Sequence, residues 1–482
     1  MTSDQRRSSS LEPLEWLTLL HTGGFVVGST WAFGGQAAWL THPLIAWGCL
    51  GAFITLAVML RPSLRASARG VLPWALPVLA FNLLVLAASF NPSLVPIRHD
   101  DATLLLPQGG DPRWPSSAMP ALARQALLQF DAIWISCFNV ALVCKRRRTL
   151  RALLLLCATN ALILAVLGTA QKLSSSPGLY FGAVPSPQKH FFATFVYHNH
   201  WAAFALLMVA ICLGLGTHYS RRYAGRDALH SPFAMALLVV LIIALTLPLS
   251  ASRSGTALVT VLLGGTFFQY IGRLVRKRRH YNESILPPLL GAATAALVAL
   301  AAVWTIAGPT IKTRLSLTQR QIAAAHQATR PDARVLLYQD TLRMAGDKPW
   351  FGWGMASYPH IFTLYNSRTS PRDRLPVFYE DAHSDWLQSL AEHGVVGTFL
   401  LVAAALLPLT ALGRLNPGNS IPAYLLGGCA LVVVYGALEF PFGNFAVVLC
   451  WWLCFFSAVQ YARLKDHSAA EPARPETPPS VP

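Results

Sequence analysis

The stretch Glu380–Leu409, "EDAHSDWLQSLAEHGVVGTFLLVAAALLPL", places acidic and histidine side chains directly against a long apolar run. An apolar run of about 20 residues is long enough to cross a bilayer as a helix. Over the whole chain, 54% of the residues are hydrophobic and only 12% are charged. A soluble domain carries about twice that charged share. The sequence therefore predicts an integral membrane protein, with titratable side chains collected where one span meets water.

Twelve apolar runs have the composition typical of transmembrane helices, although several are slightly short. They cover Leu17–Phe33, Pro43–Leu60, Val71–Phe90, Ala126–Cys144, Ala152–Ala170, Trp201–Gly216, Ala234–Leu249, Thr256–Gly272, Leu286–Gly308, Val395–Leu412, Ile421–Leu438 and Ala446–Val459. The predicted fold class is therefore an all-α integral membrane protein with about 12 transmembrane helices.

Clusters of lysine and arginine follow the second, fourth, sixth and eighth of these runs. Their sequences are "RPSLRASAR", "KRRRTLR", "RRYAGR" and "RLVRKRR". Cytoplasmic loops carry the excess of positive residues in membrane proteins, so we place these loops and both termini in the cytoplasm. The net charge of +17 is then mainly an orientation signal, and it does not indicate binding to nucleic acid.

We expect four parts in the chain, of which the longest polar connection is one. We expect an N-terminal bundle of about nine helices over 1–308, a large extracytoplasmic loop with short helices over 309–394, C-terminal transmembrane helices over 395–462, and a disordered cytoplasmic tail over 463–482. Within the loop, helical spacing predicts a helix that presents Arg334 and Tyr338 on one face. Ser384 is predicted to cap a short helix that ends at Gly394.

Four polar clusters share the outer side of the predicted membrane: "YHNHW" (197–201), "SASRSG" (250–255), Arg334, and His383 with its neighbouring acids. The "SASRSG" connection joins two spans in six residues, so Arg253 stays close to the bilayer surface. A cation fixed at that depth is costly unless it meets an anion. Guanidinium groups pair with phosphate through two parallel hydrogen bonds, which points to a phosphate-bearing lipid.

The segment "HSDWLQSLAEHGVVG" has the pattern His, then Ser, Asn or Gln, nine residues, Gly, two residues, Gly. Together with "FVYHNHWAAF", "SASRSG", and "RVLLYQD" followed by "GDKPWFGWGMASY", it resembles the bacterial O-antigen ligase and polymerase superfamily over roughly 191–440. The resemblance implies a GT-C-like membrane fold with a large periplasmic loop. It also implies a site on the periplasmic side of the inner membrane, where an undecaprenyl-diphosphate-linked glycan is transferred to a lipid or glycan acceptor without a metal or other cofactor.

Carried over residue by residue, the resemblance implies that Arg253 and Arg334 bind the diphosphate and that His383 is the general base. The chemistry is reasonable on its own, because a histidine's ordinary pKa of about 6.5 suits proton transfer near neutral pH. Two arginines can stabilise a departing diphosphate as Mg²⁺ does elsewhere. No Asp-x-Asp metal motif occurs in the predicted outer loops. The expected substrate-binding residues are Asn199, His198, His200, Tyr338, Ser252 and Ser254.

Each of these residues also has an ordinary structural interpretation. Arg253 could reach lipid headgroups, Arg334 could be a surface arginine, and His383 could be a buried structural histidine. The roles of His198 and His200 stay open. Glu439, in "LEFPFGN" at the outer end of the eleventh run, is a further candidate for a polar contact.

Several functions are compatible with the same residues. The resemblance favours an O-antigen ligase that uses lipid A–core as acceptor in lipopolysaccharide biosynthesis. A repeat-unit polymerase is the first alternative, and a protein O-oligosaccharyltransferase is the second. A lipid-linked glycan transporter is the alternative outside the enzymes. Transporters carry ionisable or helix-breaking residues near the middle of their spans, whereas here the polar groups gather at one face.

Overall fold

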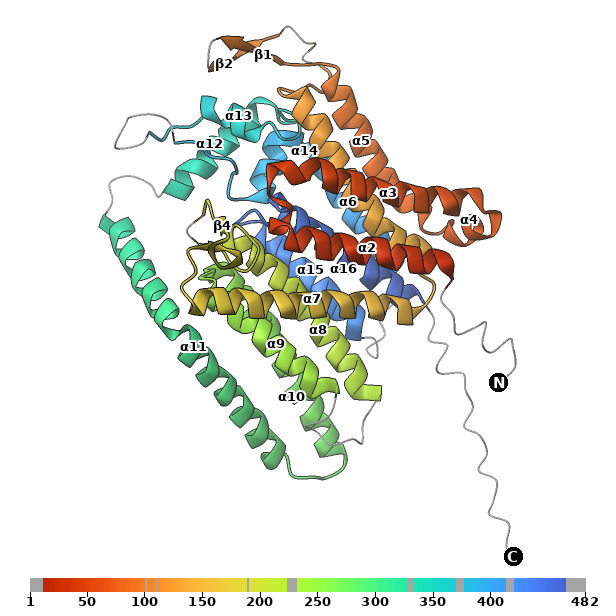
Figure 1. The fold of residues 1–482 in the computed structure, drawn as a ribbon, viewed down its shortest axis with the longest axis vertical. Coiled ribbons are helices and arrows are strands. Elements are labelled where there is room, and N and C mark those ends of the chain that lie inside the picture. The colour runs from red at the N-terminus through yellow and green to blue at the C-terminus, as the bar shows by residue number, and fades with distance from the viewer. Residues whose placement is uncertain are drawn as a thin grey trace, which may run out of the picture.

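The computed structural model describes residues 12–99, 102–108, 111, 113–188, 190–222, 232–327, 333–369, 377–412 and 420–464. Helices dominate this part of the chain (Figure 1). Within these ranges, nine helices are long and apolar enough to cross a membrane, and two shorter apolar helices accompany them. The expected all-α membrane protein is thereby confirmed, while the number of twelve spans stays a prediction.

The helices overlap all twelve of the predicted spans. Their bounds are α2 (Pro13–Trp31), α3 (Thr41–Leu60), α4 (Pro62–Ala68), α5 (Leu76–Ser89), α6 (Pro120–Val143), α7 (Arg147–Leu173), α8 (His198–Arg222), α9 (Pro232–Leu249), α10 (Arg253–His280), α11 (Leu286–Gln327), α12 (Ala333–Asp347), α13 (Tyr358–Ile361), α14 (Asp385–Leu409), α15 (Ser420–Tyr435) and α16 (Phe445–Arg463). The tail over 465–482 and the first 11 residues lie outside the described residues.

The helices α8 and α16 form the centre of the bundle. In the most apolar stretch of α8, 94% of the residues are buried, and in that of α16, 89% are, whereas none is buried in the most apolar stretch of α11. In Figure 1, α11 runs along the edge of the molecule with α10 beside its lower end. Apolar side chains that stay exposed on a helix need lipid around them, so we expect the exposed faces of α10 and α11 to contact lipid.

Two small hairpins interrupt the helical pattern. Strands β1 (Leu94–His99) and β2 (Ala102–Pro107) pair antiparallel, and so do β3 (Gly178–Leu179) and β4 (Val184–Pro185). The first hairpin projects beyond the end of α5 (Figure 1). Neither hairpin was expected from the sequence, because both lie in short connections whose composition predicts loops.

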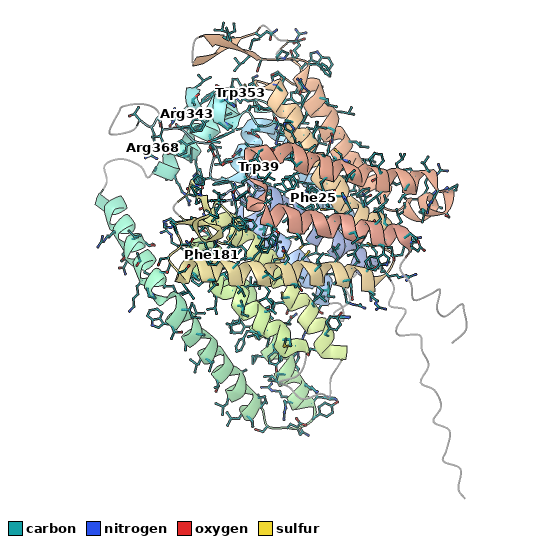
Figure 2. All side chains as sticks on the ribbon, viewed as in Figure 1. Phe25, Trp39, Phe181, Arg343, Trp353 and Arg368 are labelled. Atoms are coloured by element: carbon teal, nitrogen blue, oxygen red, sulfur yellow. The ribbon has the colours of Figure 1, made fainter. Side chains whose placement is uncertain are left out.

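The segment between α11 and α14 contributes to a small hydrophobic core that also includes Leu94, Ala118 and Ala391. Leu337 and Met344 of α12 pack there with Tyr358, Phe362 and Ala391. Figure 2 shows Arg343, Trp353 and Arg368 in this part of the molecule, beside α12 and α13. The predicted helix that carries Arg334 is confirmed as α12. This core fixes α12 against the first turns of α14.

Helix α14 begins where its sequence predicts. The Ser384 side chain caps it by accepting from the Leu387 backbone N–H, and Gly394 interrupts its geometry with φ +62°. Both local predictions are confirmed. The helix nevertheless starts ten residues before the predicted span at Val395, and α11 continues beyond Gly308, the predicted end of its span, to Gln327.

Candidate functional site

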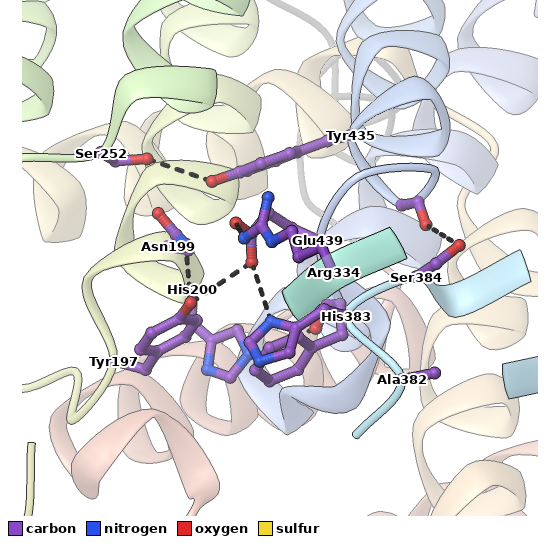
Figure 3. Close-up of polar contacts among 12 residues, drawn as sticks. Tyr197, Asn199, His200, Ser252, Arg334, Ala382, His383, Ser384, Tyr435 and Glu439 are labelled. Atoms are coloured by element: carbon purple, nitrogen blue, oxygen red, sulfur yellow. Dashed lines mark hydrogen bonds and ion pairs between the residues drawn. The ribbon is translucent and has the colours of Figure 1, made fainter. Parts of the chain in front are cut away.

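The carboxylate of Glu439, between α15 and α16, lies at the centre of a polar cluster (Figure 3). Arg334 Nη2 donates to Glu439 Oε1 at 2.6 Å. His383 Nδ1 lies 3.6 Å from Glu439 Oε2, and Tyr197 Oη donates to the same oxygen at 3.3 Å. Only 5% of the Glu439 side chain is exposed. Segments far apart in the chain therefore meet on one buried carboxylate.

The neighbours of Glu439 keep it ionised. Burial alone would raise the pKa of its carboxyl group, but the His383 imidazole and the Arg334 guanidinium outweigh burial and hold that pKa below its ordinary value. In Tyr197, burial and the nearby Glu439 charge both raise the pKa of the phenol. At neutral pH the phenol therefore keeps its proton and donates a hydrogen bond to the carboxylate.

The imidazole of His383 is held from two sides. Its Nδ1 is buried and faces Glu439 beyond hydrogen-bonding distance, while 31% of the side chain is exposed. The exposed surface therefore belongs to side-chain atoms other than Nδ1. The His383 backbone adopts a left-handed φ of +51°, and its carbonyl accepts from Tyr338 Oη at 2.9 Å. An accessible imidazole with one ring nitrogen facing a carboxylate can serve as a general base.

Phe440 organises the aromatic side of the cluster. Tyr197 stacks on its ring with centroids 5.2 Å apart, and His383 and His200 meet it edge-on at 4.9 and 5.1 Å. His200 Nε2 also lies 3.2 Å from the Phe440 carbonyl oxygen. Asn199 Nδ2 donates to Tyr197 Oη at 2.8 Å. Asn199 and His200 thus hold the neighbours of Glu439 in place.

The first turn of α10 adjoins the same cluster. Ser252 caps α10 by accepting from the Gly255 N–H at 3.3 Å, and its hydroxyl lies 3.1 Å from Tyr435 Oη. Figure 3 shows this Ser252–Tyr435 contact beside Arg334 and Glu439. The start of α10 is therefore tied to the end of α15, four residues before Glu439.

The expected residues fall into two groups. The structure brings together Arg334, His383, Tyr338, Asn199, His200 and Ser252. Arg253 is exposed, and its Nη1 donates to Thr318 Oγ1 of α11 at 2.8 Å; Ser254, half-buried, follows it in α10. His198 Nδ1 lies 3.2 Å from the His190 carbonyl oxygen. Arg253 and His198 therefore direct their side chains to partners other than Glu439.

Two acids near His383 support the chain around the cluster. Asp385 Oδ2 accepts from the Phe442 N–H at 3.1 Å, which ties α14 to the connection that carries Glu439. The Glu392 carboxylate accepts from the N–H groups of Ala356 and Tyr358 at 3.1 and 3.0 Å. Both carboxylates are thus engaged by backbone and do not face the imidazole. Within the described ranges, no three His, Cys, Asp or Glu side chains form a metal-binding group.

Sequence reasoning missed the central position of Glu439. Arg334 is 105 residues away and Tyr197 is 242 residues away, so no spacing along the chain connects them. One signal was available, because Glu439 is an acid at the outer end of a predicted span, on the same side as Arg334 and His383. A buried acid at that place requires a cationic neighbour.

Comparison with known proteins adds one finding. A family model described as O-antigen ligase matches residues 237–402. The matched residues include the start of α10, all of α12, and His383 with the first turns of α14. The resemblance noted in the sequence is confirmed for this part of the chain. A search of the curated proteins found no match.

Proposed function

We propose that this chain, whose residues 237–402 carry an O-antigen ligase domain, is a periplasm-facing inverting glycosyltransferase of the bacterial inner membrane. It transfers a glycan from undecaprenyl diphosphate to lipid A–core, without a metal. The observation that carries the proposal is the shared carboxylate of Glu439, which has Arg334 on one oxygen and His383 on the other. A base and a phosphate-binding cation thereby stand side by side at the end of the membrane bundle.

In the proposed reaction, the exposed edge of the His383 ring accepts the proton of the acceptor hydroxyl. The hydroxyl oxygen attacks the anomeric carbon of the donor sugar from the side opposite the diphosphate. The bond from that carbon to the diphosphate oxygen breaks, and its electron pair leaves with the carrier. Glu439 stabilises the imidazolium that forms, as a carboxylate does in other base–carboxylate pairs.

Two arginines bind the diphosphate in this proposal. Arg334 is about half exposed, with 48% of its side chain accessible, and it lies in the first turn of α12. Arg253 is the first residue of α10, where the helix dipole also favours an anion. Charge that develops on the departing diphosphate is thus offset by the two guanidinium groups that bind it.

A repeat-unit polymerase would use the same residues with a second glycan chain as acceptor, and a protein O-oligosaccharyltransferase would use a protein hydroxyl. The non-enzyme alternative, a lipid-linked glycan transporter, is disfavoured by the grouping of titratable side chains at span ends. Ligation remains our first proposal because the matching family model is described as O-antigen ligase.

Deletion of the gene in the native host tests the proposed function, with surface glycolipids separated on a gel. Ligation predicts that free core remains while long chains disappear from it and accumulate on the lipid carrier. A core that carries one repeat unit would identify a polymerase. Unchanged glycolipids would contradict both. Complementation with the parental gene and with His383→Ala, at matched protein levels, separates loss of activity from loss of the protein.

A further inference from the structure

The two oxygens of Glu439 have unequal partners. Arg334 Nη2 is 2.6 Å from Oε1, within the range of a strong charge-assisted hydrogen bond. His383 Nδ1 is 3.6 Å from Oε2, too far for a hydrogen bond, although this nitrogen is buried. In this structure the carboxylate is therefore paired mainly with the arginine.

We propose that Glu439 is an exchangeable counter-ion: the donor diphosphate draws Arg334 away from Glu439, and His383 then takes over the carboxylate. The general base would reach its working position only once the donor is bound. This inference rests on the proposed function, and it adds the order in which donor and base become engaged.

The diphosphate is a stronger partner for Arg334 than one carboxylate. It offers several oxygens and more than one negative charge, and a guanidinium binds such groups through two parallel hydrogen bonds. Arg334 is half exposed, so the donor can approach it from the solvent side, whereas Glu439 is buried and stays in place. Exchange therefore moves the arginine and leaves the carboxylate.

A buried carboxylate that loses its cation is strongly destabilised, so Glu439 needs a replacement. Its other neighbours are Tyr197, Tyr338, Tyr435, Asp385 and His200. Tyr197 already donates to Oε2, and Asp385 Oδ2 is an acceptor. His200 directs Nε2 to the Phe440 carbonyl. Among the described residues, a neutral His383 can donate Nδ1–H to Glu439 Oε2 in place of the arginine, while its Nε2 stays unprotonated and able to act as a base.

Glu439→Gln keeps the size of the side chain and removes its charge. If the exchange occurs, this variant should bind diphosphate more tightly than the parental protein and transfer glycan more slowly. Without a competing carboxylate, Arg334 should bind farnesyl diphosphate, used as a soluble probe, about threefold more tightly or better. Without its partner, the His383 base should give a kcat about 100-fold lower. Calorimetry on the purified full chain measures binding, and transfer from a polyprenyl-diphosphate-linked glycan measures kcat.

Other roles for Glu439 give other patterns. A purely structural carboxylate would weaken binding and transfer together in Glu439→Gln. A carboxylate that only orients His383 would lower kcat and leave the affinity for farnesyl diphosphate unchanged. Either pattern would overturn the exchange.

Arg334→Gln separates this inference from the proposed function. It should lose farnesyl diphosphate binding relative to the parental protein. If the parental protein neither binds the probe nor transfers glycan, the proposed function itself fails. If it does both, and Arg334→Gln loses binding while Glu439→Gln gains none, the exchange alone is wrong.

A structure of the parental protein with farnesyl diphosphate provides a test that requires no variant. The exchange predicts that Arg334 Nη2 contacts phosphate and no longer Glu439 Oε1. It also predicts that His383 Nδ1 moves to about 2.8 Å from Glu439 Oε2. If the 2.6 Å contact of Arg334 persists beside bound diphosphate, the exchange does not occur.

Discussion

Gly352 and Gly394 each lie against the backbone that flanks the other. A Cβ atom on Gly352 would lie 2.4 Å from the carbonyl of Glu392, and one on Gly394 would lie 2.4 Å from the carbonyl of Trp350. Both glycines have left-handed backbone angles, with φ of +68° and +62°. This contact joins the loop after α12, the helix of Arg334, to the bend in α14, the helix that follows His383.

Gly394→Ala should therefore lower the free energy of unfolding by about 2 kcal/mol or more, because it adds both a clash and an unfavourable backbone angle. Gly346→Ala is the matched control, since a Cβ on that α12 residue meets nothing within 4 Å. Thermal unfolding of the purified variants in detergent measures the difference. Equal unfolding temperatures for the two variants would contradict the packing described here.

Asp381 makes stability depend on pH. Burial and the nearby Glu380 charge raise the pKa of Asp381 from 3.8 to about 6. Between these pH values the folded protein binds the proton more tightly than the unfolded chain does, so stability falls as pH rises through this window. Asp381→Asn removes this loss of stability. The unfolding temperature of the variant minus that of the parental protein should therefore increase from pH 4 to pH 6 and then stay constant.

Glu380→Gln provides the control for Asp381. It removes a charge that raises the Asp381 pKa, so the pH range over which stability falls should become narrower. Both variants are compared with the parental protein by thermal unfolding at pH values from 4 to 8. A difference between Asp381→Asn and the parental protein that is constant over this range would show that Asp381 ionises at its ordinary pKa.

Arg334 should matter for transfer in a way that a neighbouring arginine does not. Arg334→Gln removes the proposed diphosphate cation and leaves Glu439 buried without it, so glycan transfer should fall at least about tenfold. Arg343 lies on the same helix and pairs with Asp340 at 2.5 Å, outside the Glu439 cluster. Transfer by Arg343→Gln should stay within about twofold of the parental rate. Equal effects of the two substitutions would remove Arg334 from the site.

The proposed role of Arg253 requires the paired N–H donors of its guanidinium and not only its positive charge. Arg253→Lys keeps the charge but loses the paired donors that bind phosphate, so transfer should fall by about tenfold or more. Arg276→Lys is the control, because Arg276 lies on the same helix near its opposite end. Initial rates at saturating acceptor measure both variants. A fully active Arg253→Lys would favour a role for Arg253 in holding Thr318 of α11 instead.

Local sequence signals predicted the local structure well. The helical spacing around Arg334, the cap at Ser384 and the interruption at Gly394 depend on residues within a few positions of each other. By contrast, the length of α11 could not be read from its apolar run, because the helix continues through Pro309 into a polar stretch. Hydropathy reports where a helix stops being apolar, and a helix can continue beyond that point.

The candidate site could be predicted only in part. His383 and Arg334 carried motif signals and do converge in space, but the carboxylate between them had no motif and no fixed spacing to either partner. Arg253 had the strongest positional argument, a six-residue loop, yet its guanidinium contacts Thr318. The packing of α8, α12 and the connection between α15 and α16 decides which side chains meet at Glu439. This packing cannot be predicted from motifs or spacing in a single sequence.

In the proposed reaction His383, beside Glu439, removes the proton of the acceptor. Transfer of labelled glycan from its polyprenyl-diphosphate carrier by purified His383→Gln protein tests this role. Folding is checked by an unchanged unfolding temperature. We expect a rate at least about 100-fold below the parental rate, with farnesyl diphosphate still bound. Transfer by His383→Gln at the parental rate would show that His383 is not the base.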